Sequence, residues 1–196
     1  MSEPGSGIET PILLVAMPQV LDPFFNRSVV LLAEHDADGS FGLILNRFTD
    51  IEIGTLLHGL EIEWGGDPKL LTSFGGPVQP NLGTVLFGSP LAVDTDAFTV
   101  AEIGPGIELS QDIGLLTLLA RNPPERFRIL LGYAGWGPGQ LDAEMERNDW
   151  LLAPIDAEIV FADDPPLAWS RALSSIGVRA EQLPSFVRGT EPDKAN

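Results

Sequence analysis

The residues best suited to binding a ligand lie in a glycine-rich stretch, Gly132 to Leu141, which reads Gly-Tyr-Ala-Gly-Trp-Gly-Pro-Gly-Gln-Leu. It follows an apolar run, and Pro138 suits the first turn of a helix, so we predict a strand that passes into a helix. The free N–H groups of a helix that begins near Gly137 could hold an anion, and Gln140 could add an amide donor. The same residues suit a rigid turn in which Trp136 fills core or interface volume, and we favour this packing interpretation.

Two further segments offer polar groups or bare backbone at the ends of predicted strands. Asn46 and Arg47 follow an apolar run, and the planar arginine fork can bind a carboxylate or phosphate, although a salt bridge within the chain is simpler. Gly75 and Gly76 could let a ligand approach the backbone, although a bend in the sheet is simpler. The candidate ligand-binding residues are therefore Asn46, Arg47, Gly75, Gly76, Trp136, Gly137 and Gln140.

No combination of residues indicates a particular reaction. Adjacent residues of a strand face opposite sides of a sheet, so Glu34, His35 and Asp36 do not readily converge on a metal ion. The chain has no cysteine and two histidines, which leaves little for a zinc site. It contains neither a Gly-x-Ser-x-Gly elbow nor a glycine motif for phosphates or dinucleotides. We therefore assign no catalytic residue, no metal ligand and no cofactor.

The charge of the chain limits its partners. There are 28 Asp and Glu residues against 11 Lys and Arg, which gives a net charge of −17. Because clustered cations supply the affinity for nucleic acid, we expect no direct binding to nucleic acid. The lack of cysteine excludes disulfides and fits a reducing cytoplasm, where we expect the protein. Neither a signal peptide nor an apolar run of roughly 20 residues is present, so we expect no membrane association.

Apolar patterning predicts strands, hairpins and short helices. The clearest pair is a hairpin of residues 28–33 and 41–47, with a turn at Asp38-Gly39. The other predicted strands span 11–17, 70–74, 83–87, 98–103, 128–133, 150–154 and 158–161, and we expect the first to be buried and central. The predicted helices span 53–60, 139–148 and 165–176, with one more capped by Ser110 whose buried stripe is Ile113, Leu116, Leu119 and Ala120.

These elements predict the α+β fold class. The 196 residues suit a single domain with a large mixed, mostly antiparallel sheet flanked by short helices. We place this domain at residues 11–187. Residues 1–10 and the polar residues 188–196 are predicted to be disordered.

Several segments together resemble the bacterial YqgE/AlgH family. The matching segments are Leu14–Pro18, Asp22–Phe24, Arg27–Val29, Glu34-His35, Gly42–Arg47, Gly75–Val78, Gly132–Leu141, Asn148, Trp150-Leu151 and Trp169–Gly177. The glycine-rich stretch is the most specific of them, and one departure is Asp142, where the family usually has glutamate. The resemblance implies an α+β fold with a large, mostly antiparallel mixed sheet. Proteins of this family are sometimes described as transcriptional regulators, but the resemblance implies no particular reaction.

Two classes of function fit these observations. The missing catalytic and cofactor motifs favour an interaction or regulatory protein that acts through a protein partner. The alternative is an enzyme or a binder of a small anionic ligand at a pocket near Gly132–Leu141, because the candidate residues fall at element ends, where clefts form. Convergence of the candidates on one pocket would favour the second class. A buried Trp136 with the others scattered would favour the first.

Overall fold

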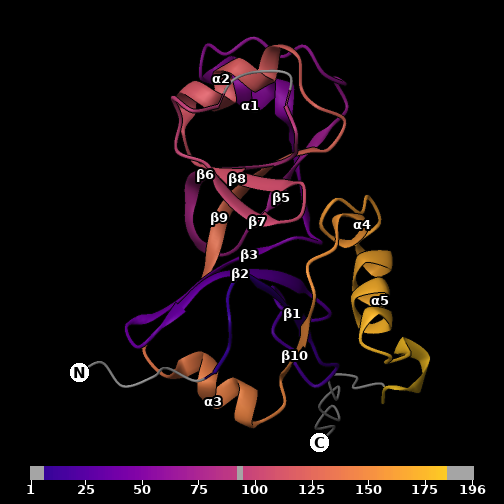
Figure 1. Ribbon diagram of the computed structural model, residues 1–196. Helices are drawn as coiled ribbons and strands as arrows, with labels where there is room; N and C mark the ends of the chain where they lie inside the picture. Colours follow the sequence, from indigo (N-terminus) through magenta and orange to yellow (C-terminus); the bar gives the residue numbers. More distant parts are fainter. Residues whose placement is uncertain (1–6, 92–94, 185–196) are drawn as a thin grey trace, which may run out of the picture.

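A computed structural model describes residues 7–91 and 95–184 of the chain (Figure 1). The predicted tail at 188–196 and the first part of the predicted segment 1–10 lie outside these residues. The strands are β1 (Ile12–Ala16), β2 (Val29–Asp36), β3 (Gly39–Ile44), β4 (Phe48–Glu52), β5 (Leu71–Phe74), β6 (Val78–Gly88), β7 (Ala101–Gly104), β8 (Ile107–Ser110), β9 (Phe127–Trp136) and β10 (Trp150–Ala153). They form one ten-stranded sheet.

The order of the strands confirms the predicted fold class. It runs β10-β1-β2-β3-β9-β6-β8-β7, while β5 pairs with both β9 and the edge strand β4. Every described strand pair is antiparallel except β5 with β9, so the sheet is mixed and mostly antiparallel. Strand β1 is fully buried at Leu13, Leu14 and Val15, as expected. It lies next to the edge rather than at the centre, because β10 pairs with its free side.

The β2–β3 hairpin forms where it was predicted. Its turn is closed by the carboxylate of Asp36, whose Oδ1 accepts the backbone N–H groups of Asp38 at 2.8 Å and Gly39 at 3.2 Å. Gly39 has a φ of 146°, and a Cβ there would lie 2.5 Å from the Trp136 carbonyl oxygen. The hairpin therefore needs glycine at this point to pack against β9.

Strand β9 is the long central element of the sheet. It pairs with β3 through its C-terminal part and with β5 and β6 through its N-terminal part. Its side chains enter all three apolar clusters of the described core: Leu130 the cluster beneath α5, Ile129 the cluster beneath α1 and α2, and Trp136 the cluster beneath α3. The two ends of the molecule are therefore joined through one strand.

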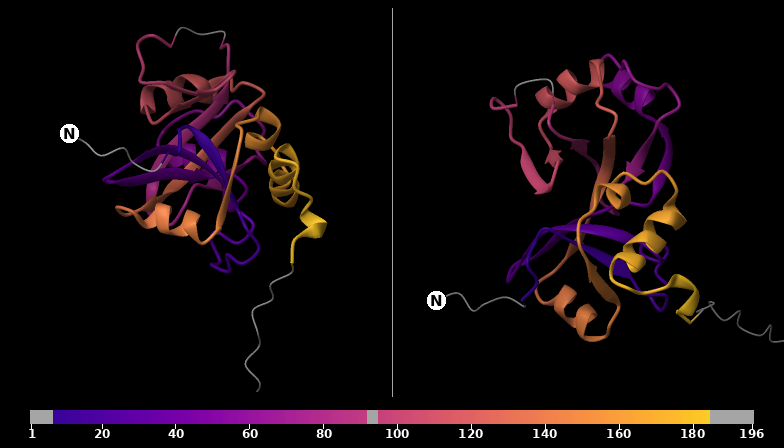
Figure 2. Two further views of the ribbon diagram at one scale, coloured as in Figure 1. Left: turned by 60° about the horizontal axis from the view of Figure 1, so that its bottom comes forward. Right: turned by 45° about the vertical axis from the view of Figure 1, so that its right-hand side comes forward.

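Short helices cover the sheet at its ends and along one side. They are α1 (Ile53–Gly59), α2 (Ile113–Arg121), α3 (Gln140–Glu146), α4 (Ala157–Val160), α5 (Pro165–Ser175) and a 3-10 turn at Ala180–Gln182. Figures 1 and 2 show α1 and α2 at one end, α3 at the opposite end, and α4 and α5 beside the sheet. No helix in the described ranges has the length and apolar character needed to cross a membrane.

Two predictions of local structure were wrong. Residues 158–161 form a turn of helix within and after α4 rather than a strand, because the Asp156 carboxylate accepts the Glu158 N–H at 2.7 Å and caps this helix. The cap of α2 is Asp112, which accepts the N–H groups of Gly114 and Leu115, whereas Ser110 ends β8. This offset turns Ile113 outward, with 59% of its surface exposed, and buries Leu115 in its place.

Candidate functional site

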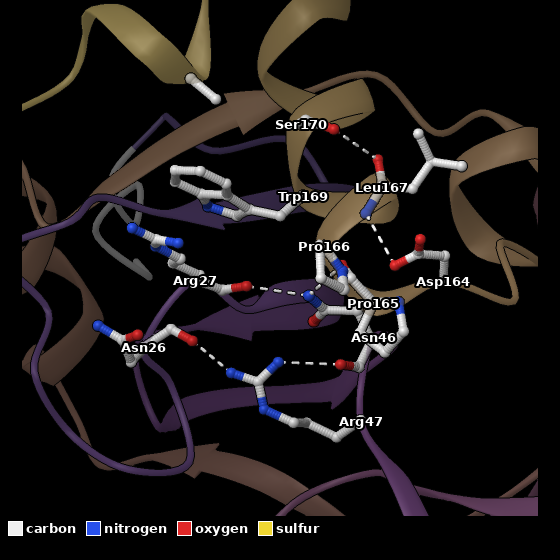
Figure 3. A pocket seen from close by; sticks show the side chains of 11 residues that line it. Asn26, Arg27, Asn46, Arg47, Asp164, Pro165, Pro166, Leu167, Trp169 and Ser170 are labelled. Atoms are coloured by element: carbon white, nitrogen blue, oxygen red, sulfur yellow. Dashed lines mark hydrogen bonds between the residues drawn. The ribbon is translucent and has the colours of Figure 1, made fainter.

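The hairpin and α5 enclose a groove that is lined by two arginines, Arg27 and Arg47. We call it the arginine groove. Its volume is about 540 Å³, and it lies between the segment before β2, the segment after β3 and the first turn of α5 (Figure 3). Its lining residues are Asn26, Arg27, Asn46, Arg47, Asp164, Pro165, Pro166, Leu167, Trp169, Ser170 and Ala180.

Asn46 forms the buried corner of the arginine groove. Its side-chain oxygen accepts the Val29 N–H at 2.8 Å. Its amide nitrogen donates to the carbonyl oxygens of Arg27 at 2.9 Å and Pro165 at 3.2 Å (Figure 3). Both N–H groups of the amide are thus used within the chain. Asn46 ties the two hairpin strands to α5 and acts as framework for the groove.

Two arginines hold the backbone around Asn46 through hydrogen bonds to carbonyl oxygens. Arg47 donates to the carbonyl oxygens of Asn46, at 2.9 Å, and of Asn26. Arg128, which is buried, donates to the carbonyl oxygens of Leu45, at 2.6 Å, and of Ala162. Burial lowers the pKa of Arg47, and burial lowers the pKa of Arg128 to about 10 although the charge of Asp163 opposes this. The Arg128 guanidinium therefore remains charged at neutral pH.

Arg27 lies at the mouth of the groove against the face of an indole. Its guanidinium carbon is 5.3 Å from the centroid of the Trp169 ring, a cation–π contact visible in Figure 3. The indole is fixed, because its N–H donates to the Ala16 carbonyl oxygen at 2.9 Å. Arg27 is exposed, and its φ of 51° is unusual for a residue with a side chain. The fold thus holds one guanidinium in place at the surface.

The first turn of α5 offers few free backbone donors to the groove. Pro165 and Pro166 occupy it, and proline has no N–H. The Asp164 carboxylate accepts the next N–H, that of Leu167, at 3.4 Å. The positive character of the groove therefore comes from Arg27 and Arg47. No carboxylate in residues 7–91 or 95–184 forms an ion pair with either side chain.

The glycine-rich stretch uses its polar groups internally. The indole N–H groups of Trp136 and Trp150 both donate to one oxygen of Glu144, at 2.9 and 2.8 Å. The other Glu144 oxygen accepts the Gln140 amide at 3.0 Å, and the Gln140 oxygen accepts the Gly137 N–H at 3.1 Å. We call Trp136, Gln140, Glu144 and Trp150 the Glu144 cluster. The Gly137 N–H and the Gln140 amide, which were considered as donors to an anion, are thus both bonded within the chain.

Gly75 and Gly76 lie in the segment between β5 and β6, where this segment passes close to the backbone of β9. A Cβ at Gly75 would overlap the carbonyl of Gly132, and one at Gly76 would overlap the carbonyl of Tyr133. Gly132 itself has a φ of 71° and faces the carbonyl oxygen of Gly76. These glycines permit close packing of two backbone segments, and the space that a side chain would fill is taken by protein.

Comparison with known proteins places the chain in a family. The family model described as AlgH-like matches residues 13–181. This chain belongs to the AlgH-like family. It is 40% identical to a UPF0301 protein of Myxococcus xanthus, over 88% of this chain and 93% of the relative, and 39% identical to one of Ruegeria pomeroyi, over 86% and 91%.

Solved structures agree with the fold of this AlgH-like chain. The solution structure of the AlgH protein from Pseudomonas aeruginosa matches with a TM-score of 0.70 and 32% identity, covering 96% of this chain and 100% of that one. A crystal structure of a protein from Corynebacterium diphtheriae matches with a TM-score of 0.69 over 87% of this chain and 86% of that one. Its 24% identity supports the shared fold alone.

The candidate residues of this AlgH-like chain lie in three places. Asn46 and Arg47 are in the arginine groove, and Gly75 and Gly76 are at the close approach to β9. Trp136 and Gln140 bond to Glu144, and Gly137 bonds to Gln140. Sequence reasoning missed Arg27 and Trp169. Arg27 had a usable signal. In a hairpin, the residues just before the first strand lie beside the residues just after the second strand. Trp169 had none, since only the docking of α5 brings it there.

Proposed function

We propose that this protein is an interaction protein that binds an extended acidic segment of a protein partner in the arginine groove. The observation that carries the proposal is Arg27, held against the Trp169 ring without a carboxylate partner among the described residues. Planar guanidinium groups bind carboxylates through paired hydrogen bonds. An external carboxylate would complete the arrangement.

The contacts of Arg27 and Arg47 differ from those of the ion-paired arginines. Asp and Glu outnumber Lys and Arg by 28 to 11, yet most Lys and Arg residues in the described ranges form no ion pair. Arg126 and Arg171 pair with Glu158, and Arg147 pairs with Asp149. Arg27 and Arg47 instead contact an indole face and backbone carbonyl oxygens. The charge of these two side chains is thus available for an incoming group.

The shape of the groove favours a chain over a compact metabolite. A second cavity, of about 290 Å³, continues from it and shares Arg27, Trp169 and Ala180 with it. Arg27 lines both cavities, so a chain that passes from one into the other would meet its guanidinium. Prolines line both parts, at Pro165 and Pro166 in one and at positions 18 and 184 in the other. Aromatic-lined grooves bind extended, proline-containing peptides, and Trp169 supplies an aromatic wall here.

A free anionic metabolite is the second candidate. The arginine groove alone has a volume typical of small-molecule sites, and the same arginines would bind its carboxylates or phosphates. Direct binding of DNA forms no part of the proposal, because the net charge of −17 repels a polyphosphate. Any regulatory role would then act through the protein partner.

Fluorescence anisotropy tests the proposal. The probes are two fluorescein-labelled hexapeptides that repeat Glu-Pro-Leu or Lys-Pro-Leu, with a labelled random DNA duplex alongside. We expect saturable binding of the glutamate peptide alone. Arg27→Gln should weaken it about tenfold or more, because a hydrogen bond to a charged group is lost. Arg121→Gln, the same charge change at an exposed position on α2, should leave it unchanged.

Three outcomes would contradict the proposal. Equal binding of the lysine peptide would show that the arginines do not select the ligand. An equal loss of peptide affinity in Arg27→Gln and Arg121→Gln would show that the loss comes from the overall charge of the protein. Displacement of the glutamate peptide by micromolar citrate would assign the groove to a small anion instead.

A further inference from the structure

Another cavity lies where the curled sheet brings β2, β3, β6, β7 and β9 together, and its chemistry differs from that of the proposed peptide site. Its volume is about 470 Å³, and its lining includes Glu34, Phe41, Gln79, Glu102 and Tyr133. We call it the tyrosine pocket. No Lys, Arg or His is among the described residues that line it. Its charge is therefore opposite in sign to that of the arginine groove.

Irregularities of the sheet converge on the tyrosine pocket. Among the described strand pairs four register shifts occur, and three of them border this cavity. They fall between Leu32 and Glu34, between Val78 and Gly83, and between Glu102 and Gly104. A bulge redirects the side chains beside it, and bulges are enriched next to functional sites. Regular pairing would not turn these side chains toward one cavity.

Two aromatic rings form one wall of the pocket. The rings of Phe41 and Tyr133 lie with centroids 5.0 Å apart and planes tilted by 38°. Gly135 makes room for them, because a Cβ there would lie 3.1 Å from the Tyr133 ring. The glycines of the stretch 132–141 thus position the one tyrosine of the chain as well as the Glu144 cluster.

Two carboxylates flank the aromatic wall. Glu34 lies directly opposite Phe41 in the β2–β3 pairing, so their side chains share a face, and Glu102 enters from β7. Both glutamates are exposed, and neither forms an ion pair with the described Lys and Arg residues. Gln79 adds an amide from a backbone position with a φ of 46°. Aromatic faces beside carboxylates favour an organic cation.

We propose that the tyrosine pocket binds an alkylammonium group. The cation lies over the Phe41 and Tyr133 rings, its N–H groups donate to the carboxylates of Glu34 and Glu102, and its alkyl chain packs on the apolar wall. The ammonium group belongs either to a free amine or to a lysine side chain. This site is independent of the arginine groove, and either can exist without the other.

NMR of selectively labelled protein tests the inference. The chain has one tyrosine, so ring-labelled tyrosine reports on Tyr133 alone. Titration with butylammonium chloride should shift its signals in a saturable way, whereas 1-butanol and sodium chloride should not. Glu34→Gln and Glu102→Gln should each weaken binding about three- to fivefold, as expected for exposed ion pairs. Glu146→Gln, at an exposed position of α3, should leave the affinity unchanged.

The peptide acetyl-Gly-Lys-Gly-amide separates the two sources of the cation. Tighter binding of this peptide than of butylammonium would assign the pocket to a lysine side chain, and the reverse order would assign it to a free amine. The inference is overturned if neither probe saturates, if 1-butanol shifts the signals equally, or if Glu146→Gln weakens binding as much as the pocket variants do.

Discussion

The Glu144 cluster and the arginine groove each join a tryptophan to charged side chains, yet they use these charges in opposite ways. In the Glu144 cluster, one carboxylate accepts two indole N–H groups and an amide, so its hydrogen-bonding capacity is met within the chain. In the arginine groove, Arg27 is exposed, its guanidinium lies on the Trp169 face, and it forms no ion pair with the described carboxylates. Polar groups that are hydrogen-bonded within the chain indicate a structural role. A charged side chain that is held in a fixed place without a partner indicates a binding site.

The comparison also separates a recognisable motif from a binding site. The glycine-rich stretch is the most specific segment in the sequence, and it builds a corner of the fold. The groove draws on residues 26–27, 46–47 and 164–170, which no single motif contains. A strong local sequence pattern therefore indicates a constrained backbone, and it does not indicate where a ligand binds.

The largest effect is expected in the Glu144 cluster. Glu144→Ala leaves the Trp136 and Trp150 indole N–H groups without their acceptor and should lower the free energy of unfolding by about 3 kcal/mol. Urea denaturation followed by tryptophan fluorescence measures this change. Glu146→Ala on the same helix, at an exposed position, should stay within about 0.5 kcal/mol. A loss below about 1 kcal/mol in Glu144→Ala would remove the framework role of the cluster.

An intermediate effect is expected at Asn46, the framework residue inside the groove. Asn46→Ala leaves the buried Val29 N–H without an acceptor and should cost about 2 kcal/mol of unfolding free energy. The same urea experiment measures it, with Asn81→Ala at an exposed position as the control. If Asn46→Ala kept full stability but lost the glutamate peptide, Asn46 would instead belong with the ligand-binding side chains.

The smallest effect on stability is expected at Arg27. Arg27→Gln removes one exposed cation–π contact and should change the free energy of unfolding by no more than about 1 kcal/mol, while peptide binding falls. Denaturant titration and anisotropy on the same preparation check both values. A loss of more than about 2 kcal/mol of unfolding free energy would show that Arg27 has a structural role. The arginine groove and the Glu144 cluster would then not differ in the way proposed.

Elements with strong local patterns were predictable from the sequence. The β2–β3 hairpin needs only alternating apolar residues and an Asp-Gly turn, and α5 needs only its apolar period after two prolines. Strand β4 was missed because its residues are mostly exposed and its strand character depends on pairing with β5. Residues 158–161 were misassigned because four apolar and polar residues fit either structure, and the capping Asp156 decides between them.

The candidate site was only half predictable for a related reason. Asn46 and Arg47 were identified from their place at a strand end, and Arg27 could have been added from hairpin geometry. The groove also needs Trp169, which is more than a hundred residues away in sequence and contacts Ala16 through its indole. The direction in which α5 docks is set by packing of the whole core, and no local pattern contains it.

The place of β9 in the chain has a consequence for synthesis on the ribosome. Strands β3, β5 and β6 are all synthesised before residue 127, where β9 begins. Each of them lacks one pairing partner until β9 has been synthesised. At about 5–20 residues per second, the hairpin waits several seconds with one edge unpaired. During that time the growing chain presents open strand edges and unfinished apolar clusters to its surroundings. The central strand that unites the finished protein is therefore also the strand whose late synthesis leaves those edges open.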